Sequence, residues 1–486
     1  MNFDKEQGKH NHIKKDWFSG KKVLIMGLGL HGGGFESARY LAGLGAELTV
    51  TDLRDEKALA PSMEKLKSFP IRYVLGRHEM EDFEKADIVI KNPGVRTDSP
   101  FLKVAKLIET DISLFLAACP ARILAVTGSK GKSTVSSALY YVLNESFEKK
   151  TGFLNGKAFL GGNITISPLS FIDELDENDI VALELSSWQL GDLRGKNQLK
   201  PRAAVLTPIM RDHLDTYPSM EDYVSDKRLI YQNQDNEDVT IARDDEWGQS
   251  FLKESRGRSL VYSEKPLGEG VSGGWISGPA EGGYARLWES SNNKEKPGSI
   301  VEVVPASPIV PGLHQKMNLL AAALALLDLG LDSGFIRENL GQFPGIEHRL
   351  EFFHESRGIK FYNDSAATIP EAAAAAVMAF EKAPVLVAGG TDKGLDFRPL
   401  ARAAAKAKGI ILLAGTGTEK LRALLDRENT GYRGPFDSLD AAIRAALDTA
   451  LPGDIVLLSP GCTSFGMFHN ETDRGLKWKE GVRNLA

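Results

Sequence analysis

The 486-residue chain contains only two cysteines, Cys119 and Cys462. Two cysteines are too few for a disulfide framework and suit a reducing compartment. The sequence also lacks any run of about 18 apolar residues, so no membrane-spanning helix is expected. The start of the chain, from Met1 to Trp17, is polar and mixed in charge, which is not typical of a signal peptide. These absences predict a cytoplasmic protein with no membrane partner.

An excess of positive charge is lacking as well. The formal net charge is −6, and basic and acidic residues are mixed along the chain. Because a dedicated nucleic-acid-binding protein carries a basic patch or stripe, we expect no nucleic-acid partner. A chain of this length is too long to fold around a single hydrophobic core. At about 150 residues per domain, we expect about three domains.

From Lys21 onward, short apolar or β-branched runs alternate with helical stretches. This alternation predicts mostly parallel sheets with helices on both faces, which is an α/β fold. The predicted strands are Lys22–Met26, Glu47–Thr51, Ile88–Lys91, Ile123–Val126, Ile180–Leu185, Ala203–Thr207, Pro384–Ala388, Gly409–Ala414 and Asp454–Ser459.

The alternating pattern is interrupted near residues 121 and 345, which divides the chain into three α/β units. We predict a disordered leader at residues 1–16 and domains at residues 17–121, 122–345 and 346–486. The first and third are expected to be Rossmann-like, and the central domain is expected to be a P-loop ATPase. A Gly-rich stretch, from Pro266 to Gly298, is expected to form a hairpin excursion of the central domain.

The octapeptide from Thr127 to Thr134, Thr-Gly-Ser-Lys-Gly-Lys-Ser-Thr, follows a predicted buried strand and precedes a helical stretch. Strand, Gly-rich turn and Lys-Ser at a helix start form the geometry that holds the phosphates of a nucleotide. Gly128 and Gly131 are separated by two residues, whereas a full P-loop has four residues in that interval. The context on both sides favours phosphate binding over a chance Gly-rich turn.

A second nucleotide signal lies near the N-terminus. Gly27-Leu28-Gly29-Leu30-His31-Gly32 fits G-x-G-x-x-G after a predicted strand, and Asp52 ends the next strand where a ribose-binding acid would lie. Alone, this motif fits a nicotinamide-dependent oxidoreductase, or a tight turn without a ligand. Two phosphate-binding turns in one chain favour an enzyme with ATP at one site and a nucleotide-linked substrate at the other.

Three further residues are weaker signals from spacing alone. Glu184 ends a predicted strand, where it can complete a magnesium shell begun by Ser133 and the phosphates. Alternatively, Glu184 is an ordinary solvent-exposed residue at the end of a strand. His213 follows the next strand and is either exposed or a ligand. Lys227 lies in a helical pattern, and nothing in its spacing distinguishes it from a solvated lysine.

Taken together and in this order, these pieces resemble the Mur ligase family of peptidoglycan synthesis. The segment Glu184–Leu190, with sequence Glu-Leu-Ser-Ser-Trp-Gln-Leu, is especially similar to the branch that adds D-glutamate. The resemblance runs from about Lys21 to the end of the chain. Further matching pieces are Gly162–Ile164, Asp212–Asp215, Gly312–His314 with Asn318, His348-Arg349, Asn363–Ser365, Gly389-Gly390 with Lys393, and Leu458–Pro460.

The resemblance implies three domains, for the UDP-linked substrate, for ATP and for the incoming amino acid. It implies that ATP contacts Gly128, Ser129, Lys130, Gly131, Lys132, Ser133, Thr134, Asn318, Arg349 and Asp364. It implies two magnesium ions held by Ser133, Glu184, His213 and Lys227, with Lys227 carbamoylated by carbon dioxide. Lys132, Lys227 and His213 would act in catalysis.

The same resemblance assigns the two remaining substrate sites. Gly29, Leu30 and Asp52 would face the uridine, and Asn163 would reach the other end of that substrate. The incoming amino acid would be held by Lys393, Thr368, Ser464 and Phe468. The implied partners are therefore two small molecules, UDP-N-acetylmuramoyl-L-alanine and D-glutamate, and the chain is expected to act as a monomer.

The implied reaction is ATP-dependent amide formation through an acyl phosphate, which adds D-glutamate to UDP-N-acetylmuramoyl-L-alanine. Two of the departures from the family pattern are Ala366, which replaces a lysine, and Glu471, which replaces an aromatic residue. Both belong to the amino-acid-binding domain. A related ligase that adds L-glutamate or another amino acid therefore remains an alternative, as does a nicotinamide-dependent oxidoreductase.

Overall fold

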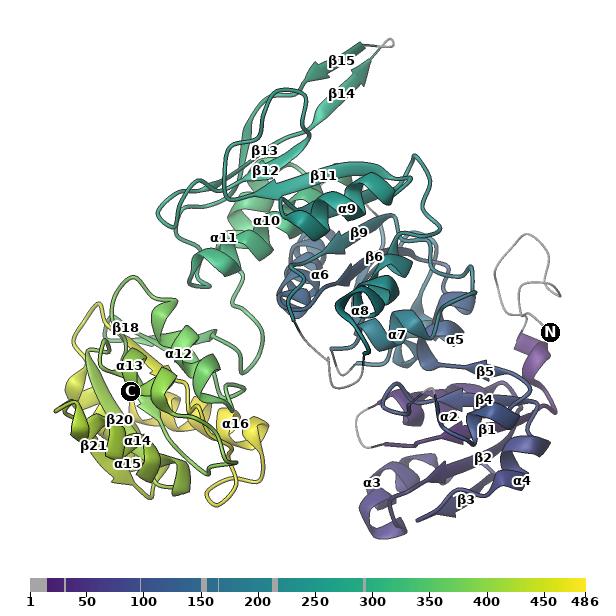
Figure 1. Cartoon of the computed structure of the whole chain (residues 1–486), viewed down its shortest axis with the longest axis horizontal. Helices are drawn as coiled ribbons and strands as arrows, with labels where there is room; N and C mark the ends of the chain where they lie inside the picture. The colour runs from purple at the N-terminus through teal and green to yellow at the C-terminus, as the bar shows by residue number, and fades with distance from the viewer. Residues whose placement is uncertain are drawn as a thin grey trace. The chain divides into compact units, whose positions relative to one another are not determined.

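The structure is a computed structural model that describes residues 15–29, 32–96, 98–149, 155–164, 166–211, 217–291 and 294–486. Its contacts divide the chain into two compact units, which are described separately below (Figure 1). The first unit comprises Met1–Trp275, Ala285–Val301 and Leu320–Ile336, and the second comprises Ile276–Tyr284, Glu302–Leu319 and Arg337–Ala486. Of the predicted leader, residues 1–14 lie outside the described residues.

The N-terminal part of the first unit is a five-stranded parallel sheet with the order β3-β2-β1-β4-β5. This order places β1 at the centre, where the chain changes the direction in which strands are added. In such sheets, ligands bind outside the carboxyl ends of the strands at this switch point. The elements are β1 (Lys22–Met26), α2 (Gly33–Gly43), β2 (Glu47–Asp52), α3 (Glu56–Leu66), β3 (Ile71–Leu75), α4 (Met80–Lys85), β4 (Ile88–Lys91), β5 (Ile108–Glu109) and α5 (Asp111–Ala118).

Alternate residues of β1 face two separate apolar layers. Val23 and Ile25 pack in the larger core, whereas Leu24 and Met26 pack in a smaller cluster with Phe83. This burial on both faces explains why the strand is continuously apolar. At its end, a Cβ added to Gly34 would lie 2.0 Å from the carbonyl oxygen of Gly27, so helix α2 approaches β1 as only a glycine allows.

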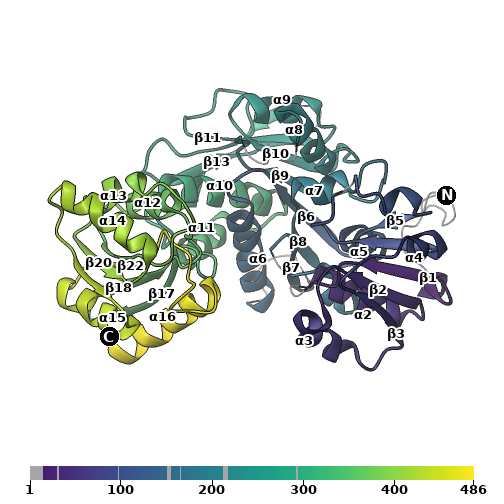
Figure 2. The same cartoon turned by 60° about the horizontal axis from the view of Figure 1, so that its bottom comes forward.

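The central sheet has nine strands in the order β16-β13-β12-β11-β10-β9-β6-β8-β7. Helix α6 packs on β6, β7 and β8, as Figure 2 shows. The elements are β6 (Arg122–Thr127), α6 (Lys132–Glu148), β7 (Ala158–Gly162), β8 (Ile180–Glu184), α7 (Ser187–Gly191), β9 (Ala203–Leu206), α8 (Met220–Lys227), β10 (Val239–Arg243), α9 (Glu246–Glu254), β11 (Arg258–Ser263), β12 (Gly273–Trp275), β13 (Gly283–Arg286), β16 (Val301–Val304), α10 (Leu313–Asp328) and α11 (Ser333–Gln342).

The Gly-rich stretch contains a hairpin and two strands of the main sheet. Strands β12 and β13 are neighbours in the nine-stranded sheet, where β12 also pairs in parallel with β11. The hairpin is the antiparallel pair β14 (Trp288–Ser291) and β15 (Lys294–Pro297), which forms a separate two-stranded sheet extending beyond β13 (Figure 1).

Within the first unit, the five-stranded sheet and the part of the central sheet around β6 to β9 share one apolar core and two ion pairs. The Lys91 ammonium lies 2.8 Å from Asp192, and both side chains are almost fully buried. Lys196 pairs with the buried Glu109 at 2.6 Å. Burial removes water from these charges, so each partner depends on the other for its solvation.

The C-terminal sheet of the second unit has the order β17-β18-β22-β19-β20-β21, and only the edge strand β17 is antiparallel to its neighbour among the pairings described. Helices α12, α13 and α14 cover one face, and α15 and α16 cover the other (Figure 2). The elements are β17 (Glu351–Ser356), β18 (Ile359–Asn363), α12 (Pro370–Met378), β19 (Val385–Ala388), α13 (Arg398–Ala404), β20 (Gly409–Leu413), α14 (Thr416–Arg427), β21 (Arg433–Phe436), α15 (Leu439–Thr449), β22 (Ile455–Leu458) and α16 (Glu471–Leu485).

The α/β fold class is confirmed, with three mostly parallel sheets flanked by helices. All nine predicted strands are present, and their ends differ by at most one residue from the prediction. Among the described residues, no helix has the length and apolar character needed to cross a bilayer. The residue bounds predicted for the three domains stay a prediction.

We expect Lys91→Met to lower the free energy of unfolding by about 3 kcal/mol, because it leaves the buried Asp192 carboxylate without its cation. The double variant with Asp192→Leu should recover most of this loss. Lys106→Met is the control, since Lys106 pairs with Asp87 at the exposed surface and such pairs contribute about 1 kcal/mol or less. Urea denaturation followed by tryptophan fluorescence measures all three, and equal losses in the single and double variants would contradict the assignment.

Candidate active site

The loop after β6, residues Gly128–Gly131, lies at the carboxyl end of the central sheet. Strand β6 pairs with β8 on one side and with β9 on the other, so the residues that follow those two strands flank the loop. Gly131 has a φ of 93° and precedes Lys132, the first residue of α6. The N-terminal backbone N–H groups of a 17-residue helix therefore point toward the loop, as a phosphate site requires.

Close packing against the segment after β9 fixes the loop. A Cβ added to Gly128, whose φ is +143°, would lie 1.9 Å from the hydroxyl oxygen of Thr207 and 2.6 Å from its carbonyl oxygen. Ser129 accepts a hydrogen bond from the Met210 N–H at 2.9 Å, and its own N–H donates to the Pro208 carbonyl at 3.0 Å. These contacts hold the loop in one conformation.

Two lysines donate to the same loop carbonyl. The Gly128 carbonyl oxygen accepts from Lys132 Nζ at 3.0 Å and from Lys227 Nζ at 2.9 Å. Lys227 is 1% exposed, and its ammonium lies 4.5 Å from the centre of the Tyr223 ring. Tyr223 in turn shares a 3.0 Å hydrogen bond with the Ser129 hydroxyl. The structure thus places Lys227, which its spacing alone did not distinguish, directly against the predicted ATP loop.

Glu184 is buried at the end of β8, beside the first turn of α6. Its Oε1 accepts from Asn163 Nδ2 at 2.9 Å, and its Oε2 lies 3.5 Å from the Ser136 hydroxyl, which itself donates to the Ser133 carbonyl. Both of these partners are neutral donors. A buried carboxylate with neutral partners next to the Ser133 turn suits a divalent cation, which binds carboxylate and hydroxyl oxygens.

Of the predicted magnesium ligands, one cannot be placed. His213 lies outside the described residues, and within the described residues no three His, Cys, Asp or Glu side chains gather into a metal cluster. The residues that are described, Ser133, Glu184 and Lys227, all lie around the loop. The oxygen donors of Ser133 and Glu184 fit magnesium, and a carbamate on Lys227 would add another anionic oxygen donor.

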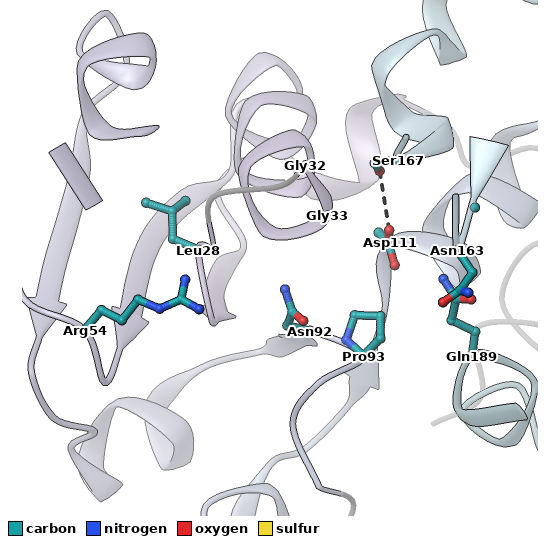
Figure 3. Close-up of a pocket in the computed structure, with 12 residues that line it drawn as sticks. Leu28, Gly32, Gly33, Arg54, Asn92, Pro93, Asp111, Asn163, Ser167 and Gln189 are labelled. Atoms are coloured by element: carbon teal, nitrogen blue, oxygen red, sulfur yellow. Dashed lines mark hydrogen bonds between the residues drawn. The ribbon is translucent and has the colours of Figure 1, made fainter. Parts of the chain in front are cut away.

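A polar cavity of about 280 Å³ lies between the loops after β1 and β4 and the segments after β7 and β8. Gly29 and Asn163, which the sequence assigned to opposite ends of one substrate, both line it. Figure 3 shows Asn163 and Gln189 on one side, and Leu28 and Arg54 on the other. Since Asn163 also donates to Glu184, this cavity adjoins the ATP loop.

Asp52 supports the Gly-rich turn rather than lining this cavity. Its Oδ2 accepts from the N–H groups of Leu28 and Gly29 at 3.0 and 3.3 Å, and its Oδ1 accepts from the Arg54 N–H at 2.9 Å. A role toward the ribose remains a prediction. Leu30, assigned to the same site, lies outside the described residues.

The other residues assigned to ATP belong to the second unit. Asn318 on α10 donates to Gln315 at 3.2 Å, and Arg349 is exposed. Asp364 accepts from the Leu350 N–H at 3.1 Å and from the Ser459 hydroxyl at 2.6 Å. Burial raises the pKa of Asp364 to about 7, although these hydrogen bonds and Arg349 oppose the shift.

The residues assigned to the amino acid surround the carboxyl end of the C-terminal sheet. Ser464 and Phe468 line one small cleft with Gly389 and Gly390. Lys393 is exposed and Thr368 is half-buried, and neither is among the residues that line this cleft. The structure therefore brings two of the four together.

The structure shows the backbone contacts of Ala366 and Glu471, the two departures in the amino-acid-binding domain. Ala366 donates its N–H to the carbonyl of His348, so its backbone has a role whatever side chain it carries. Glu471 is exposed at the first position of α16, where a negative charge is favourable, and its carbonyl accepts from Ser365.

Several residues at these sites were missed by sequence reasoning. Asn92 and Pro93 line the cavity after β4, and the rule that ligands bind beyond strand ends could have found them. Arg474, which lines the C-terminal cleft, carried no such signal. It is 1% exposed and donates to Ser365 and to the Cys462 carbonyl, and burial lowers its pKa to about 10.

Comparison with protein families gives three consecutive matches. The MurD-like N-terminal domain of Mur ligases matches residues 21–113, the Mur ligase middle domain matches residues 126–326, and the glutamate ligase domain of Mur ligases matches residues 348–462.

Two relatives are similar over nearly their whole length, and both are named UDP-N-acetylmuramoylalanine–D-glutamate ligase. The protein of Treponema pallidum (strain Nichols) is 39% identical, with 96% of this chain and 98% of the relative covered. That of Roseiflexus sp. (strain RS-1) is 40% identical, with 96% and 99% covered.

Solved structures share the fold at lower identity. The UDP-N-acetylmuramate–alanine ligase MurC of Thermotoga maritima has a TM-score of 0.56 at 19% identity, covering 96% of this chain and 99% of its own. The MurF ligase of Thermotoga maritima in complex with ADP has a TM-score of 0.51 at 16% identity, covering 97% of both chains.

We expect Gly128→Ala to weaken ATP binding about tenfold or more, because the added Cβ displaces the loop from Thr207 or strains its backbone. Isothermal titration calorimetry measures the affinity. Gly43→Ala is the matched control, since a Cβ there meets no atom within 4 Å and alanine is favoured inside a helix. Unchanged ATP affinity in Gly128→Ala would contradict the role given to this close approach.

Proposed function

Because the chain belongs to the Mur ligase family, we propose that it adds D-glutamate to UDP-N-acetylmuramoyl-L-alanine in an ATP-driven step of peptidoglycan synthesis. The observation that carries the proposal is full-length similarity at 39–40% identity to relatives with this named activity. The buried Glu184, Lys227 and the Gly128 loop supply the corresponding site.

The chain is an ATP-dependent ligase, and the reaction proceeds in two steps. The terminal phosphoryl group of ATP passes to the free carboxylate of the alanine, giving an acyl phosphate and ADP. The glutamate amine then attacks the acyl carbon and loses a proton, and the tetrahedral intermediate expels inorganic phosphate to leave an amide.

The residues of the loop act mainly by positioning and by charge. The N–H groups at the start of α6 and the Lys132 ammonium stabilise the negative charge that spreads over the transferred phosphoryl group. Asn163 links the two substrates, since it lines the UDP-substrate cavity and donates to Glu184. Because phosphoryl transfer needs little covalent help from the protein, this alignment is the main contribution.

Magnesium would be held by Ser133 and Glu184, with His213 and a carbamoylated Lys227 completing two sites. Bound magnesium supplies positive charge at the phosphate oxygens. Lys227 is almost fully buried, and its amine would react with carbon dioxide in the neutral form. The carbamate would replace a buried cation with an anion beside the loop.

Lys393, Thr368, Ser464 and Phe468 would hold the amino acid. The exposed Lys393 provides a cation for a carboxylate, and the cleft of Ser464 and Phe468 provides a hydroxyl and an aromatic surface. An oxidoreductase is not favoured, since the Gly-rich turn after β1 faces the same cavity as Asn163, next to an ATP loop. Dependence on ATP and two free cysteines fit action in the cytoplasm, and a monomer remains our expectation.

Phosphate release with UDP-N-acetylmuramoyl-L-alanine and ATP tests the proposal directly. We expect turnover with D-glutamate and less than about 1% of that rate with L-glutamate, the order of discrimination given by a hydrogen-bonded site. Lys132→Ala should fall below about 1% of wild-type turnover, and the exposed Lys253→Ala should match the wild type. Preference for L-glutamate would reassign the substrate, and full activity of Lys132→Ala would refute the ATP-loop assignment.

Lys227→Ala tests the carbamate. We expect nearly complete loss of turnover, with partial recovery on addition of acetate or another small carboxylic acid, which restores an anionic oxygen ligand at the loop. Lys253→Ala with and without acetate controls for effects of the acid on the assay. Absence of recovery in Lys227→Ala that still binds ATP would argue against the carbamate.

A further inference from the structure

Asp111 is a buried acidic residue that lines the cavity described above. Neither the sequence motifs nor the proposed mechanism gives it a role. It begins helix α5 directly after β5, and it is 6% exposed. Thr110 and Ser113 already satisfy the start of this helix through a capping box. The side chain of Asp111 is therefore not needed as the helix cap, and burying its charge calls for another explanation.

The hydrogen bonds of Asp111 leave one carboxylate oxygen weakly satisfied. Oδ1 accepts from the Ile112 N–H at 2.9 Å, whereas Oδ2 has only a long hydrogen bond of 3.4 Å from the Ser167 hydroxyl. Among the described residues, no ion pair involves Asp111. Burial raises its pKa to about 6, and the nearby negative charge of Asp192 contributes to the rise.

Asp111 lies between the two ends of the cavity, one assigned to the uridine and the other to the alanine of the substrate. Its Oδ2 would be 3.3 Å from a Cβ on Gly33, at the start of α2, while its hydrogen bond to Ser167 reaches the segment after β7. Figure 3 shows the carboxylate between Asn92 and Asn163. Toward one side lies the Gly29 turn, and toward the other lies Asn163 with its bond to Glu184.

We propose that Asp111 contacts the sugar portion of the UDP-linked substrate, and that its Oδ2 accepts a hydrogen bond from a hydroxyl or amide N–H of that sugar. The inference rests on the proposed function, because it takes the uridine to lie at the Gly29 end and the alanine at the Asn163 end. A carboxylate repels phosphate, so it suits the uncharged sugar between them better than the diphosphate. Asp111 is then a specificity-determining residue for a donor-bearing sugar.

The test compares two ligands on Asp111→Asn. Isothermal titration calorimetry at pH 8 measures binding of UDP-N-acetylmuramoyl-L-alanine and of UDP alone to the wild type, to Asp111→Asn and to Asp98→Asn. The last is an exposed acid of the same sheet region and controls for loss of charge. We expect Asp111→Asn to weaken binding of the sugar nucleotide about tenfold, as for one hydrogen bond to a charged acceptor. Binding of UDP should change less than twofold.

Each other outcome overturns the inference in a distinct way. Equal weakening of UDP and of the sugar nucleotide would assign Asp111 to the architecture of the cavity. Unchanged binding of both would exclude the contact. Failure of the wild type to bind the sugar nucleotide would refute the proposed function itself, and the inference with it.

Discussion

The arrangement of this active site depends on the close packing of Gly128 against Thr207. This packing fixes a turn whose carbonyl oxygen accepts hydrogen bonds from Lys132 and Lys227, which approach from helices far apart in the sequence. A side chain on residue 128 would overlap Thr207, so the turn, the start of α6 and the end of α8 could not all keep their places. Two lysine side chains therefore meet at one carbonyl of the loop.

A second linkage runs through Glu184. Its carboxylate receives a hydrogen bond from Asn163, which lines the cavity beyond β1 and β4, and it lies beside the first turn of α6. One buried carboxylate therefore connects the wall of this cavity to the loop after β6. Since Glu184 and Asn163 come from neighbouring parallel strands, β8 and the end of β7, the sheet sets their separation. The register of these two strands therefore sets the distance between Glu184 and Asn163.

Sequence patterns predicted these features unevenly, for physical reasons. Buried parallel strands are almost continuously apolar, so each of the nine predicted strands was visible locally. The sequence did not separate the β14–β15 hairpin from the sheet strands β12 and β13, because short Gly-rich strands carry little information on register. Lys227 and Arg474 had no local signal at all. Their importance comes from burial against segments distant in the chain, and a helical lysine or arginine is usually exposed.

The sequence by itself determined the fold class, the ATP loop and the likeness to Mur ligases, because these depend on short-range order: apolar runs, glycine spacing and the order of motifs. Only the tertiary structure decided that Lys227 faces the Gly128 carbonyl, that Asp52 is bonded to the Gly-rich turn after β1, and that Asp111 lines the cavity beside that turn. These are contacts between residues from 23 to 99 positions apart, or burial by several elements at once. No local pattern encodes them, because packing of whole sheets brings them together.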